Sequence, residues 1–338
     1  MDLAQRLRDA RPERFEVTCL PDFFVDVVVP MAPWPVARDQ MAAVAERRGG
    51  NLATAQHLLS QGGNAANCAL ALARLGVRSR LIAPTNALGM SLAELWLRGV
   101  DLSRVRADGA LSSTVALEFG PERRNVMLSH PGDIADFGPE DLTDQDWAVI
   151  EDSDLVLVGN WVLNRNGTAL AARVLERAGR AGVTTYFDSG DPGSRAGEVP
   201  TLFNSVLASP WLRVLACNEN ELGFFAAAAG DVRSTSLLDR ARSVKREVAA
   251  TLDVHTRDVA MSLGAGNALA EAKPPPLEGK RATGAGDAWN AGNILGYLLE
   301  LPAEERLRVA NAVATLYVTN AEPAHPKLED VAALVARR

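Results

Sequence analysis

The sequence predicts an α/β fold built on a doubly wound, mostly parallel sheet flanked by helices. From residue 154 onward, short apolar runs of strand length alternate with stretches of helical periodicity, which favours strand–helix–strand units. Polar residues follow several of these runs, at the edge where open parallel sheets bind ligands. Apolar residues make up 47% of the 338 residues, enough for a large core. We therefore expect one domain over residues 1–338.

Composition narrows the class of protein. The formal net charge of −7 gives no support to nucleic-acid binding. No run of about 18 apolar residues predicts a membrane span, and the first residues lack the apolar core of a signal peptide. Cys19, Cys68 and Cys217 are too few and too far apart for a disulfide framework. We expect a cytoplasmic protein that binds neither a membrane nor a nucleic acid.

The first two strands are predicted in residues 15–30, with a break at Pro21 and Asp22. Asp26 stands alone in the second apolar run, and a lone carboxylate is costly to bury without partners. Two interpretations stay open at this point. Asp26 is either an acid at a strand end that faces solvent, or a carboxylate that accepts hydrogen bonds from ligand hydroxyls.

Two later segments complete the irregular part of the chain. Residues 31–60 are less regular and predict a variable insertion rich in proline and glycine. Residues 113–129 predict a hairpin with its turn at Gly120 and Pro121. Arg123 and Arg124 near the tip of this hairpin are either solvated charges or phosphate contacts.

Gly62 and Gly63 come directly before a predicted helix. Residues 65–75 are strong helix formers, and Gly76 is a natural stop. Two glycines before a helix are weak evidence for a site by themselves, because they more often form a turn.

Polar residues also follow the strands predicted near residues 157 and 186. Asn160 and Asn164 follow the first of these strands, and Asp188 follows the second. The two asparagines either orient substrate hydroxyls or serve as caps and turns. Arg195 is either a surface residue or a contact for a phosphate already on the substrate.

Asn218 and Glu221 follow the next predicted strand. An N-cap asparagine with a glutamate three residues later is a capping box. The same pair suits a magnesium site, because Mg²⁺ takes oxygen ligands and keeps several waters. Both interpretations are compatible.

The stretch at residues 281–300 has the clearest chemical pattern. The small residues Gly284, Ala285 and Gly286 precede Asp287, and a helical pattern follows. A helix that begins there points unpaired N–H groups and the positive end of its dipole at a bound anion. Asp287 is then either an ordinary N-cap or a base that accepts a proton from a hydroxyl about to attack a phosphate.

These segments together resemble the ribokinase-like sugar kinases, also called the phosphofructokinase-B family. The sequence TGAGD at residues 283–287 resembles the C-terminal signature of that family, and GGNAANCALALARLG at residues 62–76 resembles its N-terminal signature. The resemblance covers nearly the whole chain. It implies that Asp287 is the catalytic base, and that residues 284–286 form an anion hole for the transferred phosphate.

The resemblance also implies an acceptor site and a lid. Asp26, Gly62, Gly63 and Asn67 would bind the sugar, with Asn160 and Asn164 as further candidates. A small β lid inserted from roughly residues 27–60 and 111–130 would cover the sugar and pair two subunits as a homodimer.

On the donor side, the resemblance implies ATP and Mg²⁺. Glu221 would hold the metal, largely through water, and the nucleotide would contact a further set of residues: Asn218, Ser262, Gly264, Gly266, Thr283 and Asn311. Many members carry an acid two residues before the threonine of TGAGD as part of a monovalent-cation site. This chain has Arg281 there, which argues against a potassium site of that kind.

The sequence thus predicts an ATP-dependent kinase that phosphorylates a hydroxyl of a pentose or hexose. A nucleoside or sugar-phosphate kinase of the same family is an alternative, and so is a catalytically silent homologue that binds a sugar or nucleoside. The chain has no GxxxxGK[ST] sequence, so it is not a P-loop kinase, and neither GAG sequence continues as a dinucleotide-binding motif.

Overall fold

The structure is a computed structural model that describes residues 2–54, 56–121, 124–276, 279, 283–320 and 324–337. Over these residues the largest element is a nine-stranded sheet. Its strands are β1 (Glu16–Leu20), β4 (Arg78–Pro84), β5 (Asp101–Arg106), β8 (Leu155–Val158), β9 (Thr184–Phe187), β10 (Val214–Asn218), β11 (Thr251–His255), β12 (Ala260–Leu263) and β13 (Leu269–Ala272).

The strands follow the spatial order β13-β12-β11-β10-β9-β8-β1-β4-β5. All neighbours from β11 to β5 pair in parallel, whereas β12 and β13 run antiparallel at one edge. The chain winds from β1 through β4 to β5 in one direction and from β8 to β11 in the other. The doubly wound, mostly parallel sheet predicted from the sequence is confirmed. The strand order reverses beside β1, where folds of this kind bind ligands.

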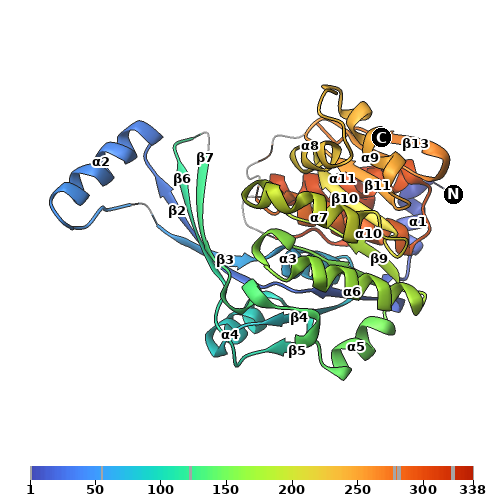
Figure 1. Ribbon diagram of the computed structural model, residues 1–338, viewed down its shortest axis with the longest axis horizontal. Coiled ribbons are helices and arrows are strands. Elements are labelled where there is room, and N and C mark those ends of the chain that lie inside the picture. Colours follow the sequence, from blue (N-terminus) through green and yellow to red (C-terminus); the bar gives the residue numbers. More distant parts are fainter. Residues whose placement is uncertain are drawn as a thin grey trace.

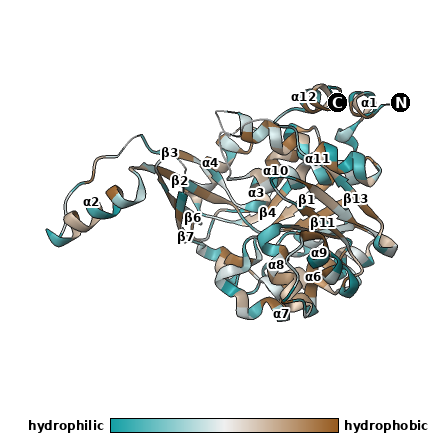
Figure 2. Ribbon diagram, turned by 90° about the horizontal axis from the view of Figure 1, so that it is seen from above, coloured by the Kyte–Doolittle hydropathy of each residue, from teal (hydrophilic) through white to brown (hydrophobic). Residues whose placement is uncertain are grey.

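Helices cover both faces of the sheet, and the apolar strands lie between the two helical layers (Figure 2). One layer contains α1 (Leu3–Asp9), α3 (Asn64–Arg74), α4 (Ala87–Trp96), α10 (Ala285–Leu298), α11 (Ala303–Thr319) and α12 (Leu328–Val335). The other contains α5 (Asp144–Glu151), α6 (Gly167–Arg180), α7 (Val199–Leu202), α8 (Glu219–Ala228) and α9 (Leu237–Glu247).

Strand β8 shows why the sheet is buried on both faces. Leu155 and Leu157 pack into one apolar cluster, and Val156 and Val158 pack into the other. Alternate side chains of a strand point to opposite faces, so an uninterrupted apolar run is what a central parallel strand requires.

A second, four-stranded sheet extends from one side of the main body (Figure 1). Its order is β3-β2-β6-β7, with β2 at Phe24–Met31, β3 at Leu58–Gly62, β6 at Ser113–Phe119 and β7 at Arg124–His130. Strand β2 follows β1 closely, and β3 leads directly into α3. This small sheet therefore adjoins the carboxyl end of β1.

The segment between β2 and β3 contains a feature that its composition did not predict. Residues 31–60 were expected to be irregular, but Trp34–Glu46 form the helix α2, which lies at the far end of the small sheet (Figure 1). The helix begins after Pro33, and Pro35 is in its first turn, where proline is tolerated. Its weak apolar face, with only Ala37 buried, explains why periodicity did not reveal it. Among the described residues, none of the helices has the length and apolar character needed to cross a bilayer.

Candidate active site

Asp22 joins the end of β1 to the start of α3. Its carboxylate accepts hydrogen bonds from the backbone N–H of Asn64 at 3.0 Å and of Ala65 at 2.8 Å, and from Nδ2 of Asn160 at 2.6 Å. The first N–H groups of a helix have no partner inside the helix, so Asp22 acts as a cap from another segment. The sequence interpretation treated Asp22 only as part of a strand break.

The glycines before α3 are required by close packing. Gly63 has φ of 94°, and a Cβ there would lie 3.0 Å from both the carbonyl oxygen and Oδ2 of Asp22. A Cβ on Gly62 would lie 2.2 Å from Oδ2 of Asp26. The two predicted glycines therefore let Asp22 and Asp26 approach the start of α3.

At the start of α10, the backbone turns through Gly284, which has φ of 81°. A Cβ at this position would lie 2.6 Å from the hydroxyl of Tyr317, so glycine is required here as well. Helix α10 begins at Ala285, and its first N–H groups have no acceptor within the helix. The turn can therefore hold an anion in the manner predicted for residues 284–286.

The carboxylate of Asp287 lies between the two helices α10 and α3. Its Oδ1 accepts a hydrogen bond from Nδ2 of Asn64 at 3.1 Å, and its Oδ2 accepts one from Nδ2 of Asn67 at 2.9 Å. The two hydrogen bonds orient the carboxylate. Asp287 is 7% exposed, so a small part of the residue remains accessible to solvent. The structure thus brings together the two segments that the sequence had identified separately.

Several carboxyl groups gather at this edge of the sheet, and burial is the main reason that their pKa values are raised. The pKa of Asp287 lies well above the usual range, with the charges of Asp188 and Asp22 adding to the effect of burial. Burial also raises the pKa of Asp22 and of Asp188, and it raises that of Asp26 to about 6. Perturbed carboxyl groups of this kind are typical of functional sites.

Asp26 belongs to a polar row across the small sheet. It pairs with Ser60 on one side and Thr114 on the other, and Thr114 pairs with Ser129. Residues directly opposite each other share a face, so these four side chains lie on one side of the sheet. Thr114 donates a hydrogen bond that opposes the rise in the pKa of Asp26. The sequence alone suggested only Asp26 from this row, because the register that aligns the others is a tertiary feature.

Asn218 and Glu221 form the predicted capping box. Oε2 of Glu221 accepts from the backbone N–H of Asn218 at 2.9 Å, and Oδ1 of Asn218 accepts from the N–H of Glu221 at 3.0 Å. Burial, and next the charge of Asp188, raise the pKa of Glu221 well above its usual range. Asp188 is itself held by Nδ2 of Asn290 on α10 at 2.5 Å.

Three of the predicted nucleotide contacts are wrong. Ser262, Gly264 and Gly266 were placed in a turn at the carboxyl edge of a parallel strand, but β12 runs antiparallel to β11. Leu263 pairs with Leu252, near the start of β11, so the turn after β12 lies at the opposite edge of the sheet from Asp287. Ser262 instead accepts a hydrogen bond from the buried Arg306 at 2.9 Å.

Asn311 is also engaged elsewhere. Its Oδ1 accepts from Nε1 of Trp289 at 2.9 Å and its Nδ2 donates to the carbonyl oxygen of Ala272 at 3.0 Å, so the side chain stabilises the core and is not available to a nucleotide. Thr283 is exposed beside the start of α10. Arg281, predicted to replace a cation-site acid, lies outside the described residues, as does Arg123.

Asn164 and Arg195 have structural roles. Nδ2 of Asn164 donates to the carbonyl oxygen of Phe137 and its Oδ1 accepts from the N–H of Asn166, which favours the turn interpretation over substrate contact. Arg195 lies over the ring of Trp161 and pairs with Glu198. Asn160, in contrast, lies at the site, since it donates to Asp22.

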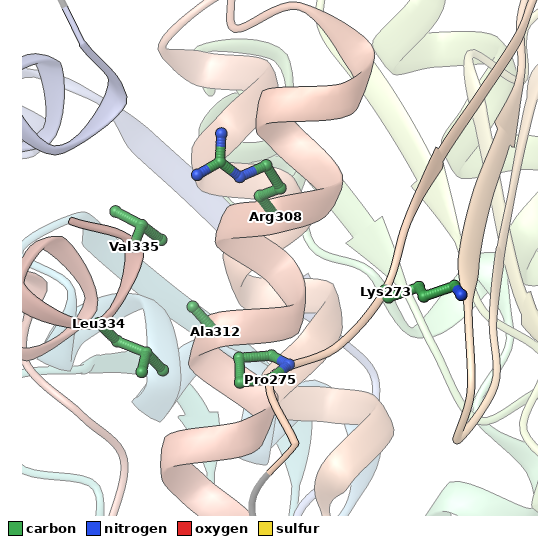
Figure 3. A pocket seen from close by; sticks show the side chains of 6 residues that line it. All are labelled: Lys273, Pro275, Arg308, Ala312, Leu334 and Val335. Atoms are coloured by element: carbon green, nitrogen blue, oxygen red, sulfur yellow. The ribbon is translucent and has the colours of Figure 1, made fainter. Parts of the chain in front are cut away.

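A narrow pocket near the C-terminus is separate from this site. It has a volume of about 20 Å³ and is lined by Lys273, Pro275, Arg308, Ala312, Leu334 and Val335 (Figure 3). This volume suits about one water molecule, and none of the predicted site residues contributes to the lining. The pocket is therefore not a substrate site.

Solved structures with the same fold are kinases by their names. The ribokinase of Arabidopsis thaliana, complexed with ribose and ATP, has a TM-score of 0.75 and 20% identity, covering 95% of this chain and 98% of its own. Adenosine kinase of Sinorhizobium meliloti has a TM-score of 0.74 and 17% identity, covering 97% and 99%. The ribokinase of Cryptococcus neoformans var. grubii serotype A, in complex with ADP, has a TM-score of 0.71 and 18% identity, covering 94% and 98%.

At such low identity these likenesses show the fold alone, which is that of the ribokinase-like kinases. The sequence matches no curated protein. The model of the pfkB family of carbohydrate kinases, however, matches residues 38–330, and the chain belongs to this family. It is therefore a protein of the kinase class, as the sequence predicted.

Proposed function

We propose that this protein is an ATP-dependent kinase that transfers the terminal phosphate to a hydroxyl of a neutral sugar, a pentose or hexose. The observation that carries the proposal is the position of Asp287. It lies in the first turn of α10, beside the backbone turn suited to an anion, and Asn64 and Asn67 hold its two oxygens. A base and an anion site are thus adjacent, as phosphoryl transfer requires.

In the proposed reaction, Asp287 accepts the proton of the acceptor hydroxyl. The acceptor oxygen forms a bond to the terminal phosphorus, and the bond from that phosphorus to the bridging oxygen breaks, leaving its electron pair on the diphosphate. The N–H groups of residues 284–286 face the phosphoryl oxygens as charge develops on them. The amides of Asn64 and Asn67 stabilise the charged form of Asp287, which is the form that can act as a base.

The residues at the ends of β9 and β10 fit a magnesium ion. Among the described residues, no three His, Cys, Asp or Glu side chains converge closely enough to form a complete metal cage. The charge of Asp188 nevertheless helps to raise the pKa of Glu221, and a bound cation would relieve this repulsion. Mg²⁺ keeps several waters and binds through one or two carboxylates together with substrate phosphates. Glu221 and Asp188 would hold it, and the ion would offset the charge of the donor phosphates.

Charge in the acceptor pocket favours a neutral acceptor over a sugar phosphate. The carboxyl groups of Asp22, Asp26 and Asp287 lie at the same edge, and the charge of Asp22 raises the pKa of the other two. A second anion on the acceptor would be repelled. Arg195 is the candidate for binding a substrate phosphate. It already forms an ion pair with Glu198 and donates hydrogen bonds to the carbonyl oxygens of Trp161 and Asn164.

The small sheet supports a lid and a homodimer within this proposal. Opposite the polar row with Asp26, the row Leu59, Val27, Val115 and Leu128 forms an apolar stripe on the other face. Leu59 and Leu128 are 54% and 59% exposed, which is costly unless another surface covers them. Leu128→Glu should convert the dimer to monomers by light scattering, whereas Leu88→Glu, at an equally exposed site on α4, should leave it unchanged.

An acceptor panel tests the proposed function. The purified protein is incubated with ATP and Mg²⁺ and with neutral pentoses and hexoses, nucleosides, sugar phosphates and sugar acids, and ADP release is measured. We expect turnover with a neutral acceptor and at least tenfold lower kcat/KM with its phosphorylated counterpart. A preference for a phosphorylated acceptor would contradict the charge argument. Binding of a neutral acceptor without any ADP release would identify a silent homologue.

A further inference from the structure

The last parallel strand, β11, ends at the candidate site with a histidine that the proposed mechanism does not yet use. His255 pairs with Asn218 of β10, so both lie at the carboxyl edge of the sheet. Its imidazole packs against the indole of Trp289 on α10, with 4.8 Å between ring centres and 31° between ring planes. A Cβ built on Gly286 would lie 3.5 Å from Cε1 and 3.8 Å from Nε2 of His255. The Nε2 edge of the ring therefore lies beside the anion-binding turn.

The ring nitrogens of His255 have no hydrogen-bond partner within the described part of the chain. Thr256, the next residue, is occupied: its Oγ1 accepts from the N–H groups of Asp258 and Val259 and closes the turn to β12. Burial lowers the pKa of His255 to about 4, so the ring is neutral at pH 7 and one nitrogen carries a proton. The site thus contains an N–H donor that has no acceptor among the residues that the structure describes.

Consecutive residues at the start of α10 face different sides of the site. Asp287 contacts Asn64 and Asn67 of α3, which belong to the acceptor side next to β1 and β2. Gly286 faces β11, and three strands separate β11 from β1 in the sheet. A phosphate held at the start of α10 would therefore have the acceptor on one side and His255 on the other.

We propose that His255 donates a hydrogen bond from its neutral ring to the terminal phosphate of the nucleotide donor. The contact deepens the proposed function, on which it rests. The imidazole keeps its proton throughout the transfer, while Asp287 takes the proton of the acceptor hydroxyl. The ring also packs on Trp289, so its N–H group is oriented before the nucleotide binds.

Two substitutions separate hydrogen bonding from ring packing. His255→Phe keeps an aromatic ring against Trp289 but removes the donor, whereas His255→Gln removes the ring and keeps an N–H donor. His130→Phe, at an exposed position on β7, is the matched control. Dissociation constants for ATP and ADP with Mg²⁺ are measured by titration calorimetry without any acceptor, so that the readout does not depend on turnover.

We expect His255→Phe to weaken ATP binding about 10- to 100-fold, the usual effect of losing a hydrogen bond to a charged group. ADP binding should change less than threefold, because ADP lacks the terminal phosphate. His255→Gln should stay within about fivefold of the unaltered protein for both nucleotides, the margin we allow for an imperfectly placed amide. The control should bind both nucleotides normally.

Other results would overturn the assignment. Equal losses for ATP and ADP would mean that the ring only packs against its neighbours, and unchanged ATP binding in His255→Phe would mean no contact. The proposed function has a separate outcome: a protein whose ATP affinity depends on His255 but which phosphorylates no acceptor would refute the kinase activity and not this contact. A protein that binds neither nucleotide would refute both.

Discussion

The amide of Asn67 donates to Oδ2 of Asp287 at 2.9 Å, and this contact joins segments separated by 220 residues in the chain. An amide that donates to a carboxylate favours its charged form and lowers its pKa, against the burial that raises it. The contact therefore has a function beyond packing: it keeps the proposed base able to accept a proton.

Replacing Asn67 with alanine should raise the pKa of Asp287 further. Because only the charged carboxylate can act as a base, the acid limb of the kcat profile should move to higher pH. A hydrogen bond to a charged group is worth about 1.5–3 kcal/mol, so the shift should be about one to two pH units. Asn51→Ala, at an exposed position outside the site, should leave the profile unchanged. A lower rate with an unmoved acid limb would mean that Asn67 contacts the substrate and does not set the pKa of Asp287.

Asp26→Ala should weaken acceptor binding while leaving the nucleotide KM near normal. A hydrogen bond from a hydroxyl to a carboxylate is worth about 1.5–3 kcal/mol, so the loss of one such bond should raise the acceptor KM by about one to two orders of magnitude. Initial-rate kinetics with each substrate varied in turn provide the measurement. Parallel losses for both substrates would indicate a folding defect. An unaltered acceptor KM would mean that Asp26 does not bind the acceptor.

The same carboxyl group should lower the stability of the protein. Burial raises the pKa of Asp26 from 3.8 to about 6, so the folded state holds the proton more tightly than the unfolded state. The contribution of Asp26 to stability is then most favourable below pH 4 and is lost as the pH rises through 6. Asp26→Asn should therefore raise the free energy of unfolding by about 1–3 kcal/mol at pH 7, with the gain vanishing near pH 4. Denaturant titrations at both pH values measure it, and a gain that does not depend on pH would contradict the argument.

Much of the fold was predictable from local patterns. The apolar runs at residues 155–158 and 214–218 became β8 and β10 because uninterrupted apolar strands need two covering layers. The reversal at β12 was not predictable, since a four-residue run such as Ala260–Leu263 has the same composition in either direction. Because β12 runs antiparallel to β11, Ser262 and Gly264 lie away from the edge of the sheet at which the sequence predicted them.

The candidate site was predictable where glycine and charge mark it in sequence, at Gly63, Gly284 and Asp287. The roles of Asp22, Asn64 and His255 were not predictable, because each depends on a partner in a distant segment. Asn311 was misassigned for the converse reason: nothing local indicates that Trp289 and Ala272 satisfy its amide.

Glu221→Gln should raise the magnesium concentration that gives half-maximal rate. Glutamine keeps the oxygen that caps α8 but loses the charge that would attract the ion. The loss of one nearby charge should shift the magnesium curve by about tenfold, with a normal rate at saturation. The measurement is a magnesium titration at fixed ATP. An unchanged curve would leave Glu221 with only its capping role, and lower thermal stability without a magnesium effect would support the same conclusion.

The most direct test of the account compares the unaltered protein with Asp287→Asn, using the best neutral acceptor. Asparagine keeps the shape of the side chain but cannot accept the proton, and general-base catalysis is typically worth about 10²–10⁴-fold. We predict that kcat falls by that factor while the calorimetric dissociation constant for ATP changes less than threefold. A correctly folded Asp287→Asn protein that retains more than about a tenth of the original kcat would contradict the central claim that Asp287 is the catalytic base.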